Sequence, residues 1–158
     1  MVKVSIICVG KIKKQYMKDF IEDYSKRCSK YCRIEIIELK DEVLHGNSEQ
    51  ALNNLLVSES KNIDKYLIDS AYKICLAIEG KQFTSEQFAQ VLTDGFNTNA
   101  HIQFIIGGSY GISEELKNKC DRKVSFSKMT FPHQVMRGVV LEQIYRGFKI
   151  NNNESYHK

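Results

Sequence analysis

The chain has 158 residues, of which 42% are hydrophobic and 27% charged, with a formal net charge of +4. This composition predicts one soluble globular domain over residues 1–158 and excludes a disordered chain, while the positive charge favours an anionic partner. No apolar run is long enough to span a membrane and no secretion signal opens the chain, which predicts a cytoplasmic protein without a membrane partner.

The first quarter of the chain predicts a buried strand, a basic helix and a second strand. Residues 2–9 form a continuous apolar run closed by Gly10, which is typical of a strand buried on both faces. Apolar side chains then recur at helical spacing over 17–31, and 33–39 alternates like a strand. Eight basic residues and only three acids lie within 11–33, which indicates either a solvated helix face or a phosphate-facing surface.

The rest of the chain continues the alternation of strands and helices, which predicts an α/β fold with a mostly parallel sheet. Thr84 predicts a helix N-cap, and Gly80 and Gly107 each close an apolar run. The last eight residues carry no core signal, so we expect a flexible tail over 150–158. The predicted elements are a helix over 48–66, a strand over 72–78, a helix from 84, a strand over 101–106, a helix over 113–120, a strand over 123–127 and a helix over 132–150.

The five cysteines predict reduced thiols and no metal site. Cys8 and Cys75 lie in apolar, strand-like runs, where buried thiols are common. Cys28 and Cys32 are one helical turn apart but have no second pair of ligands elsewhere in the chain. An odd number of cysteines without a CxxC pair is typical of a protein in a reducing compartment.

One catalytic motif is present and two nucleotide-binding motifs are absent. No stretch matches a P-loop, and the turn after the first strand lacks GxGxxG. The sequence "GGSYG" fits the GxSxG nucleophile elbow in a strand-to-helix turn, and Asp121, His133 and His157 follow in the order of a hydrolase triad. The alternatives are a serine hydrolase acting through Ser109 and a glycine turn whose serine has no special role.

The stretch "SFSKMTFPHQVMRGVV" holds the only proline of the chain and begins the last predicted helix. Thr130 is the expected N-cap, and Pro132 suits the first helical turn. Arg137 falls in the middle of the apolar face of this helix, so it must be paired or must face a pocket or another subunit. Gly138 and Gly147 weaken the helix, which predicts close approach of another backbone or of a ligand.

Four segments of the chain resemble one known family. The segments "FIIGGSYG", "SFSKMTFPHQVMR", "EQIYRGFKI" and the terminal "YHK" closely resemble the ribosomal RNA large subunit methyltransferase H family, a branch of the SPOUT methyltransferases. The resemblance runs along the whole chain and is densest from Phe104 onward. It implies a SPOUT-type α/β knot with a deep C-terminal trefoil knot, and a homodimer with the last helix in the interface.

The same resemblance implies S-adenosylmethionine as the cofactor and N3 of a pseudouridine in 23S ribosomal RNA, on the assembled ribosome, as the target. Three positions depart from the family pattern, namely Ala77, Ser60 and Gly138. They concern the polarity of the cofactor site and the packing of the last helix. The implied cofactor contacts are Leu76, Gly107, Phe126, Ser127, Lys128, Met129, Thr130 and Phe131.

Methyl transfer to an imide nitrogen requires alignment of donor and acceptor, removal of the N3 proton and stabilisation of negative charge on the flanking carbonyls. We expect Arg137 or Arg146 to stabilise that charge and His133 or His157 to lie near the base. His133 could equally be a first-turn helix residue without a proton role. A protein that binds the ribosome without catalysis is a further alternative. The predicted RNA contacts are Tyr156, His157 and Lys158 of the tail and Lys11, Lys13 and Lys14 of the basic segment.

Overall fold

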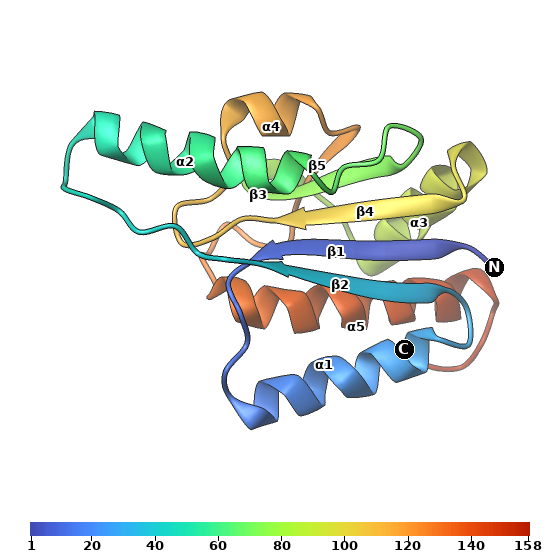
Figure 1. Ribbon diagram of the computed structural model, residues 1–158. Helices are drawn as coiled ribbons and strands as arrows, with labels where there is room; N and C mark the ends of the chain where they lie inside the picture. Colours follow the sequence, from blue (N-terminus) through green and yellow to red (C-terminus); the bar gives the residue numbers. More distant parts are fainter.

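Five parallel strands form one sheet in the order β2-β1-β4-β3-β5 in the computed structural model, which describes residues 1–158 (Figure 1). This confirms the predicted α/β class with a parallel sheet, while the deep trefoil knot stays a prediction. The strands are β1 (Lys3–Val9), β2 (Arg33–Leu39), β3 (Tyr72–Gln82), β4 (His101–Ile106) and β5 (Arg122–Ser125). The helices are α1 (Gln15–Cys28), α2 (Glu49–Asp64), α3 (Ser85–Thr98), α4 (Glu114–Asn118) and α5 (His133–Asn151).

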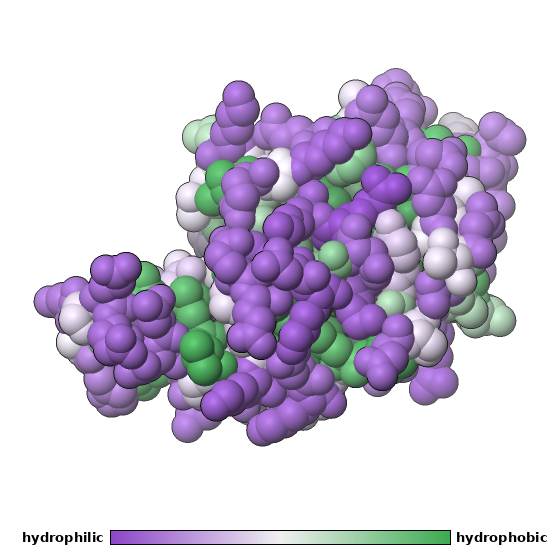
Figure 2. Space-filling view, turned by 90° about the horizontal axis from the view of Figure 1, so that it is seen from above, coloured by the Kyte–Doolittle hydropathy of each residue, from purple (hydrophilic) through white to green (hydrophobic).

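Helices cover both faces of the sheet (Figure 1). Helices α1, α3 and α5 pack on one face, against Val4, Ile6 and Cys8 of β1, and α2 and α4 lie on the other, where Ile7 and Val9 are buried. The strand β1 is therefore buried on both faces, as its continuous apolar run predicts. Figure 2, which looks onto the side of α2 and α4, shows a mainly hydrophilic surface with separate apolar patches. None of the helices combines the length and the hydrophobicity of a membrane-spanning segment.

Helix capping agrees with the sequence at α3 but differs at α5. The Thr84 hydroxyl accepts from the Gln87 N–H at 3.2 Å, and the Gln87 side chain accepts from the Thr84 N–H at 2.9 Å, which completes a capping box. At α5, Pro132 occupies the N-cap position and no side chain caps the helix. The prediction of Thr130 as N-cap is wrong because the turn over 126–131 continues past it and lines a cavity.

Gly80 does not end β3, contrary to the prediction. The register of β3 against β5 shifts between Leu76 and Lys81, and both of these residues pair with Val124. The intervening residues form a bulge that lets the strand continue to Gln82. A Cβ at Gly80 would lie 2.8 Å from the backbone of β5, so a glycine is needed where the two strands approach each other.

The two glycines of α5 contact neighbouring helices of the same chain. A Cβ at Gly138 would overlap the ring of Phe20 in α1, and a Cβ at Gly147 would lie 2.6 Å from Leu92 in α3. Helix α5 therefore packs closely between α1 and α3 on one face of the sheet. These glycines do not indicate a two-fold interface, because contacts within one chain account for them.

The tail packs against α1 and α5, which corrects the prediction that it lacks packing partners. The Tyr156 ring lies edge-on to Tyr145 with centroids 4.9 Å apart, and its hydroxyl lies 3.2 Å from the hydroxyl of Tyr24. The Glu154 carboxylate is 2.6 Å from the Lys149 ammonium. Tyr145 and Lys149 lie on α5 and Tyr24 lies on α1. The composition of the tail alone could not predict contacts with these helices.

Candidate active site

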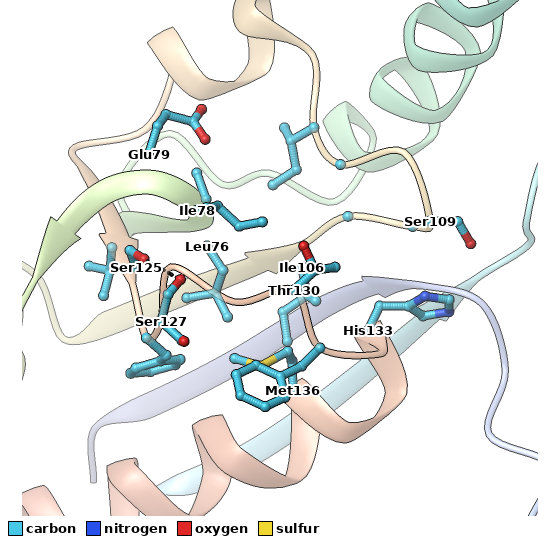
Figure 3. Close-up of a pocket in the computed structure, with 18 of the residues that line it drawn as sticks. Leu76, Ile78, Glu79, Ile106, Ser109, Ser125, Ser127, Thr130, His133 and Met136 are labelled. Atoms are coloured by element: carbon cyan, nitrogen blue, oxygen red, sulfur yellow. Dashed lines mark hydrogen bonds between the residues drawn. The ribbon is translucent and has the colours of Figure 1, made fainter.

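A cavity of about 840 Å³ opens at the carboxyl ends of β4 and β5 and beside the bulge of β3 (Figure 3). Three chain segments form its walls, namely 76–79 at the bulge of β3, 106–112 from the end of β4 onward and 124–133 from the end of β5 onward, and Met136 adds a side chain from α5. Ligands of parallel α/β sheets bind at this edge, where strands end and glycine turns let the backbone approach. The volume suits a ligand of the size of a nucleoside cofactor.

The wall after β4 is a tight glycine turn. A Cβ at Gly107 would overlap the carbonyl of Gly111, and Gly111 itself adopts a φ of +82°. The Gly111 N–H donates to the Gly108 carbonyl at 3.1 Å, which closes the turn. Only glycine fits at position 107, so the turn presents main-chain atoms to the cavity at this position.

The same turn does not form the site of a serine hydrolase. Ser109 lines the cavity (Figure 3), but no hydrogen bond joins its hydroxyl to a histidine. The Asp121 carboxylate accepts from the Lys73 backbone N–H at 2.7 Å, so it is held against β3. The imidazole of His157 is instead within hydrogen-bond distance of Glu86 in α3 and Arg146 in α5. The triad order in the sequence therefore does not become a triad in space.

The wall after β5 is a loop that two serines hold in shape. The Ser125 hydroxyl donates to the Ser127 carbonyl at 2.9 Å, and the Ser127 hydroxyl accepts from the Met129 N–H at 2.9 Å. Met129 and Phe131 are 72% and 44% exposed, so large apolar side chains stand at the rim without a protein partner. Such a rim offers apolar surface to a bound ring system.

Seven of the eight predicted cofactor contacts line this cavity, and Lys128 is the one that does not. The apolar wall comprises Leu76, Ile106, Ile112, Val124, Phe126 and Met136. Glu79 and Lys117 form an ion pair at the polar end of the cavity, and the pKa of Glu79 is lowered by its hydrogen bond with Lys117. A carboxylate at this position can accept from hydroxyl or ammonium groups of a ligand.

His133 stands where the cavity meets the turn after β1 (Figure 3). Its Nε2 atom is buried and has no hydrogen-bond partner. A Cβ at Gly10 would lie 3.0 Å from this Nε2 and 2.9 Å from Oδ2 of Asp41, so both groups face this glycine. The pKa of His133 is lowered, chiefly by burial and against the opposing influence of Asp41. The imidazole is therefore neutral near pH 7 and able to accept a proton.

Arg137 is fully buried outside the cavity lining, and its guanidinium is committed to other partners. Its Nη1 donates to the Glu38 carboxylate at 2.7 Å, and its Nη2 donates to the carbonyls of Val9 and Gly10 at 2.8 and 2.6 Å. The two Nη groups are therefore paired within the chain, while the Nε atom is buried without a hydrogen-bond partner.

Arg146 and His157 form a separate cluster near the other end of α5. The Arg146 Nη1 lies 3.1 Å from Nδ1 of His157, and Nε2 of this histidine lies 2.7 Å from the Glu86 carboxylate. Glu142 accepts from Arg146 Nε at 3.0 Å. Arg146 lies thirteen residues after His133, which corresponds to roughly 20 Å along the helix. The four predicted catalytic residues therefore do not meet within one chain.

The predicted RNA-contacting lysines are exposed. Lys11, Lys13 and Lys14 lie on the segment between β1 and α1, and Lys158 ends the chain. Tyr156 is half-buried by its contacts with the helices.

Sequence reasoning missed Asp41 and Glu59. The Glu59 side chain of α2 is 6% exposed and faces Gly108, where a Cβ would lie 3.1 Å from its Oε2. Burial, then Asp41 and Glu42, raise the pKa of Glu59 to about 7. No spacing in the sequence marks either residue, because both meet the glycine turns only through the fold.

Comparisons with known proteins agree with this architecture. A family model described as a predicted SPOUT methyltransferase matches residues 2–157. A protein of Bifidobacterium adolescentis named ribosomal RNA large subunit methyltransferase H is 48% identical over 158 residues, covering 99% of both chains. One of the same name from Clostridioides difficile is 47% identical over 157 residues, covering 98% of this chain and 99% of the relative.

A solved structure shares the fold. It is the structure of a probable methylase family protein from Haemophilus influenzae Rd KW20, with a TM-score of 0.60 and 13% identity, covering 100% of this chain and 72% of that chain. At this identity the likeness concerns the fold alone. The match to the family model and the full-length relatives together show that the chain belongs to the ribosomal RNA large subunit methyltransferase H family of SPOUT methyltransferases.

Proposed function

We propose that this protein uses S-adenosylmethionine to methylate N3 of a pseudouridine in 23S ribosomal RNA, on the assembled ribosome and in the cytoplasm. The observation that carries the proposal is the cavity of about 840 Å³ at the carboxyl ends of β4 and β5 and beside the bulge of β3, which seven of the eight predicted cofactor contacts line. The relatives named ribosomal RNA large subunit methyltransferase H support the choice of RNA target.

The residues of the cavity fit the cofactor. S-adenosylmethionine supplies, when bound, a methyl group on a positively charged sulfur. The apolar wall suits its adenine ring, with Leu76 and Ile106 on the strand side and Met136 on the helix side. The turn at Gly107 and the loop over 126–131 would hold it through main-chain atoms.

His133 is our candidate for the proton acceptor. A base must take the N3 proton of the target before or during methyl transfer. His133 lines the cavity, is neutral near pH 7 and has an unpartnered Nε2 atom. Asp41 on the far side of Gly10 would stabilise the imidazolium that forms.

The cluster of Arg146, Tyr156 and His157 is our candidate for contact with the target base. Within one chain it lies roughly 20 Å along α5 from His133, too far to share one base with it. We therefore propose a homodimer in which the tail cluster of one subunit serves the cavity of its partner. The exposed lysines at 11, 13 and 14 would bind phosphates of the RNA.

Titration calorimetry with S-adenosylmethionine tests the cofactor assignment. We expect a dissociation constant in the micromolar range, about −8 kcal/mol. Gly107→Ala should weaken binding at least about tenfold, because its Cβ would overlap the Gly111 carbonyl and deform the wall. Asn53→Ala, at an exposed position of α2 that does not line the cavity, is the control. Labelling of Ser109 by a fluorophosphonate, with no cofactor binding, would favour a hydrolase instead.

A further inference from the structure

Residues 10–14, which carry the three exposed lysines, have few local interactions that hold their conformation. We call it the lysine loop. Lys14 is the N-cap residue of α1 but makes no side-chain cap hydrogen bond, and the first turn of α1 has no acidic residue. A helix start without these features leaves its N–H groups and its entry direction unsupported. The orientation of the loop therefore depends on contacts from elsewhere in the fold.

Those contacts come from β2 and from the first two turns of α5. The Glu38 carboxylate of β2 accepts from the Ile12 N–H at 2.8 Å and from Arg137 Nη1 at 2.7 Å, through the same oxygen. Arg137 also donates to the carbonyls of Val9 and Gly10, and the Gly10 N–H donates to the Leu39 carbonyl at 2.6 Å. The planar guanidinium thus joins the end of β1 to β2.

The same turns of α5 form part of the cavity wall. His133 and Met136 line the cavity, and Arg137 is the next residue along the helix. Gly10, at the start of the lysine loop, has a φ of +92° and faces His133 so closely that a Cβ would lie 3.0 Å from its Nε2. The first two turns of α5 therefore contact both the lysine loop and the cavity, and they set the position of one relative to the other.

We propose that Arg137 and Glu38 are positioning residues, which hold the lysine loop in a fixed orientation relative to the cofactor cavity. Arg137 has no exposed surface, so its guanidinium acts through the loop rather than on the substrate. Phosphates bound by the three lysines then place the target nucleotide at the cavity. Arginine is required because its fork reaches a carboxylate and two carbonyls at once, which a lysine ammonium cannot do in this geometry. This inference rests on the proposed function of the protein.

The test uses the whole protein and ribosomes that lack the methyl group. Glu38→Ala removes the acceptor that Ile12 and Arg137 share, and Glu38→Gln restores a neutral acceptor. Glu35→Ala is the matched control, because Glu35 lies on the same strand but pairs with Lys3. Ribosome affinity is measured as a function of potassium chloride concentration at a fixed magnesium concentration. Each Glu variant is made in two backgrounds, the unaltered chain and a chain in which Lys11, Lys13 and Lys14 are replaced by alanine.

Glu38→Ala should lower ribosome affinity by about tenfold and reduce the slope of log affinity against log salt by roughly one unit for each phosphate that the loop no longer binds. Glu38→Gln should recover part of this affinity, and Glu35→Ala should leave it unchanged. In the background without loop lysines, Glu38→Ala should have less than about a twofold further effect, because the groups that it misplaces are already absent. Affinity for S-adenosylmethionine alone should stay unchanged, while amide exchange at Ile12 should accelerate.

An equal decrease in affinity in both backgrounds, or unchanged amide exchange at Ile12, would overturn the inference. If the unaltered protein methylates ribosomes and the decreases are additive, only the inference fails. If it neither binds nor methylates ribosomes, the proposed function fails and the inference fails with it. Should the unpaired guanidinium prevent folding of Glu38→Ala, the double substitution Arg137→Met with Glu38→Ala removes both charges and undergoes the same comparison.

Discussion

Among the single residues, Glu59 makes the stability of the fold depend on pH. Its carboxyl is 6% exposed, and its pKa is raised from 4.5 to about 7 by burial first and then by Asp41 and Glu42. The folded state therefore favours the protonated carboxyl over the ionised one. The stabilising contribution is complete below the unfolded pKa and is lost as the pH rises through about 7.

Glu59→Gln should therefore stabilise the protein more at alkaline than at acidic pH, because an amide cannot ionise. The gain in free energy of unfolding should grow to about 3 kcal/mol between roughly pH 5 and pH 8. Urea unfolding at several pH values measures it. Glu115→Gln on exposed α4 is the control and should show no such trend. A gain that is the same at every pH would mean that Glu59 is not a buried titrating group.

At the scale of elements, the packing of α5 against α1 depends on glycine at position 138. The ring of Phe20 occupies the space that a Cβ at Gly138 would need, and this ring lies edge-on to Tyr24 at 5.2 Å between centroids. Gly138 is one of the three positions that depart from the family pattern, and the aromatic ring of Phe20 in α1 fills the space that a larger side chain would need there.

Gly138→Ala should destabilise the protein by about 1–2 kcal/mol, because overpacking against Phe20 outweighs the gain in helix propensity. With Phe20→Leu present, the same substitution should become neutral or stabilising by up to about 1 kcal/mol. Thermal unfolding of the unaltered protein, the two single variants and the double variant completes a double-mutant cycle. Additive effects would show that the two positions do not compete for the same space.

Substitutions in the tail can separate its contribution to stability from its contribution to methyl transfer. Tyr156→Phe should cost about 1 kcal/mol, because the hydroxyl no longer bonds to Tyr24 and Glu142. Deletion of 156–158 should cost about 2 kcal/mol, because it also removes the aromatic ring that packs on Tyr145. The cofactor cavity does not include these residues, so cofactor affinity should persist.

Methyl transfer by the folded, truncated protein should fall about 5- to 150-fold if the tail stacks on a base. The measurement is initial rate on ribosomes at a temperature well below the unfolding midpoint of the truncated protein. A rate equal to that of the full chain would remove Tyr156 and His157 from the set of functional residues.

For the whole molecule, patterns local in sequence were the ones that could be predicted. Apolar runs and caps indicated the order of strands and helices, and the glycine turn and the loop over 126–131 lie at the cavity as expected. The partner of Arg137 could not be predicted, because Glu38 lies 99 residues away, and Tyr156 meets Tyr24 across 132 residues. The bulge at Gly80 was missed because it depends on the register of β5.

The proposed dimer leads to a complementation experiment. Light scattering should give twice the mass of one chain at micromolar concentration. His133→Ala and a chain lacking 156–158 should each have reduced activity alone, but mixed subunits should regain activity if the tail of one chain serves the cavity of the other. In such a mixed dimer, one site has both an intact His133 and an intact tail. A monomer with full activity, or no recovery on mixing, would contradict this assembly.

The most direct test of the central claim is to incubate the protein with ribosomes that lack the modification and S-adenosylmethionine carrying a labelled methyl group, and then to map the label. The account predicts label on N3 of a single pseudouridine in 23S ribosomal RNA, with Gly107→Ala giving little incorporation because its cavity wall is deformed. Ribosome binding without any transfer of label would contradict the account, as would label on a protein or on another nucleotide.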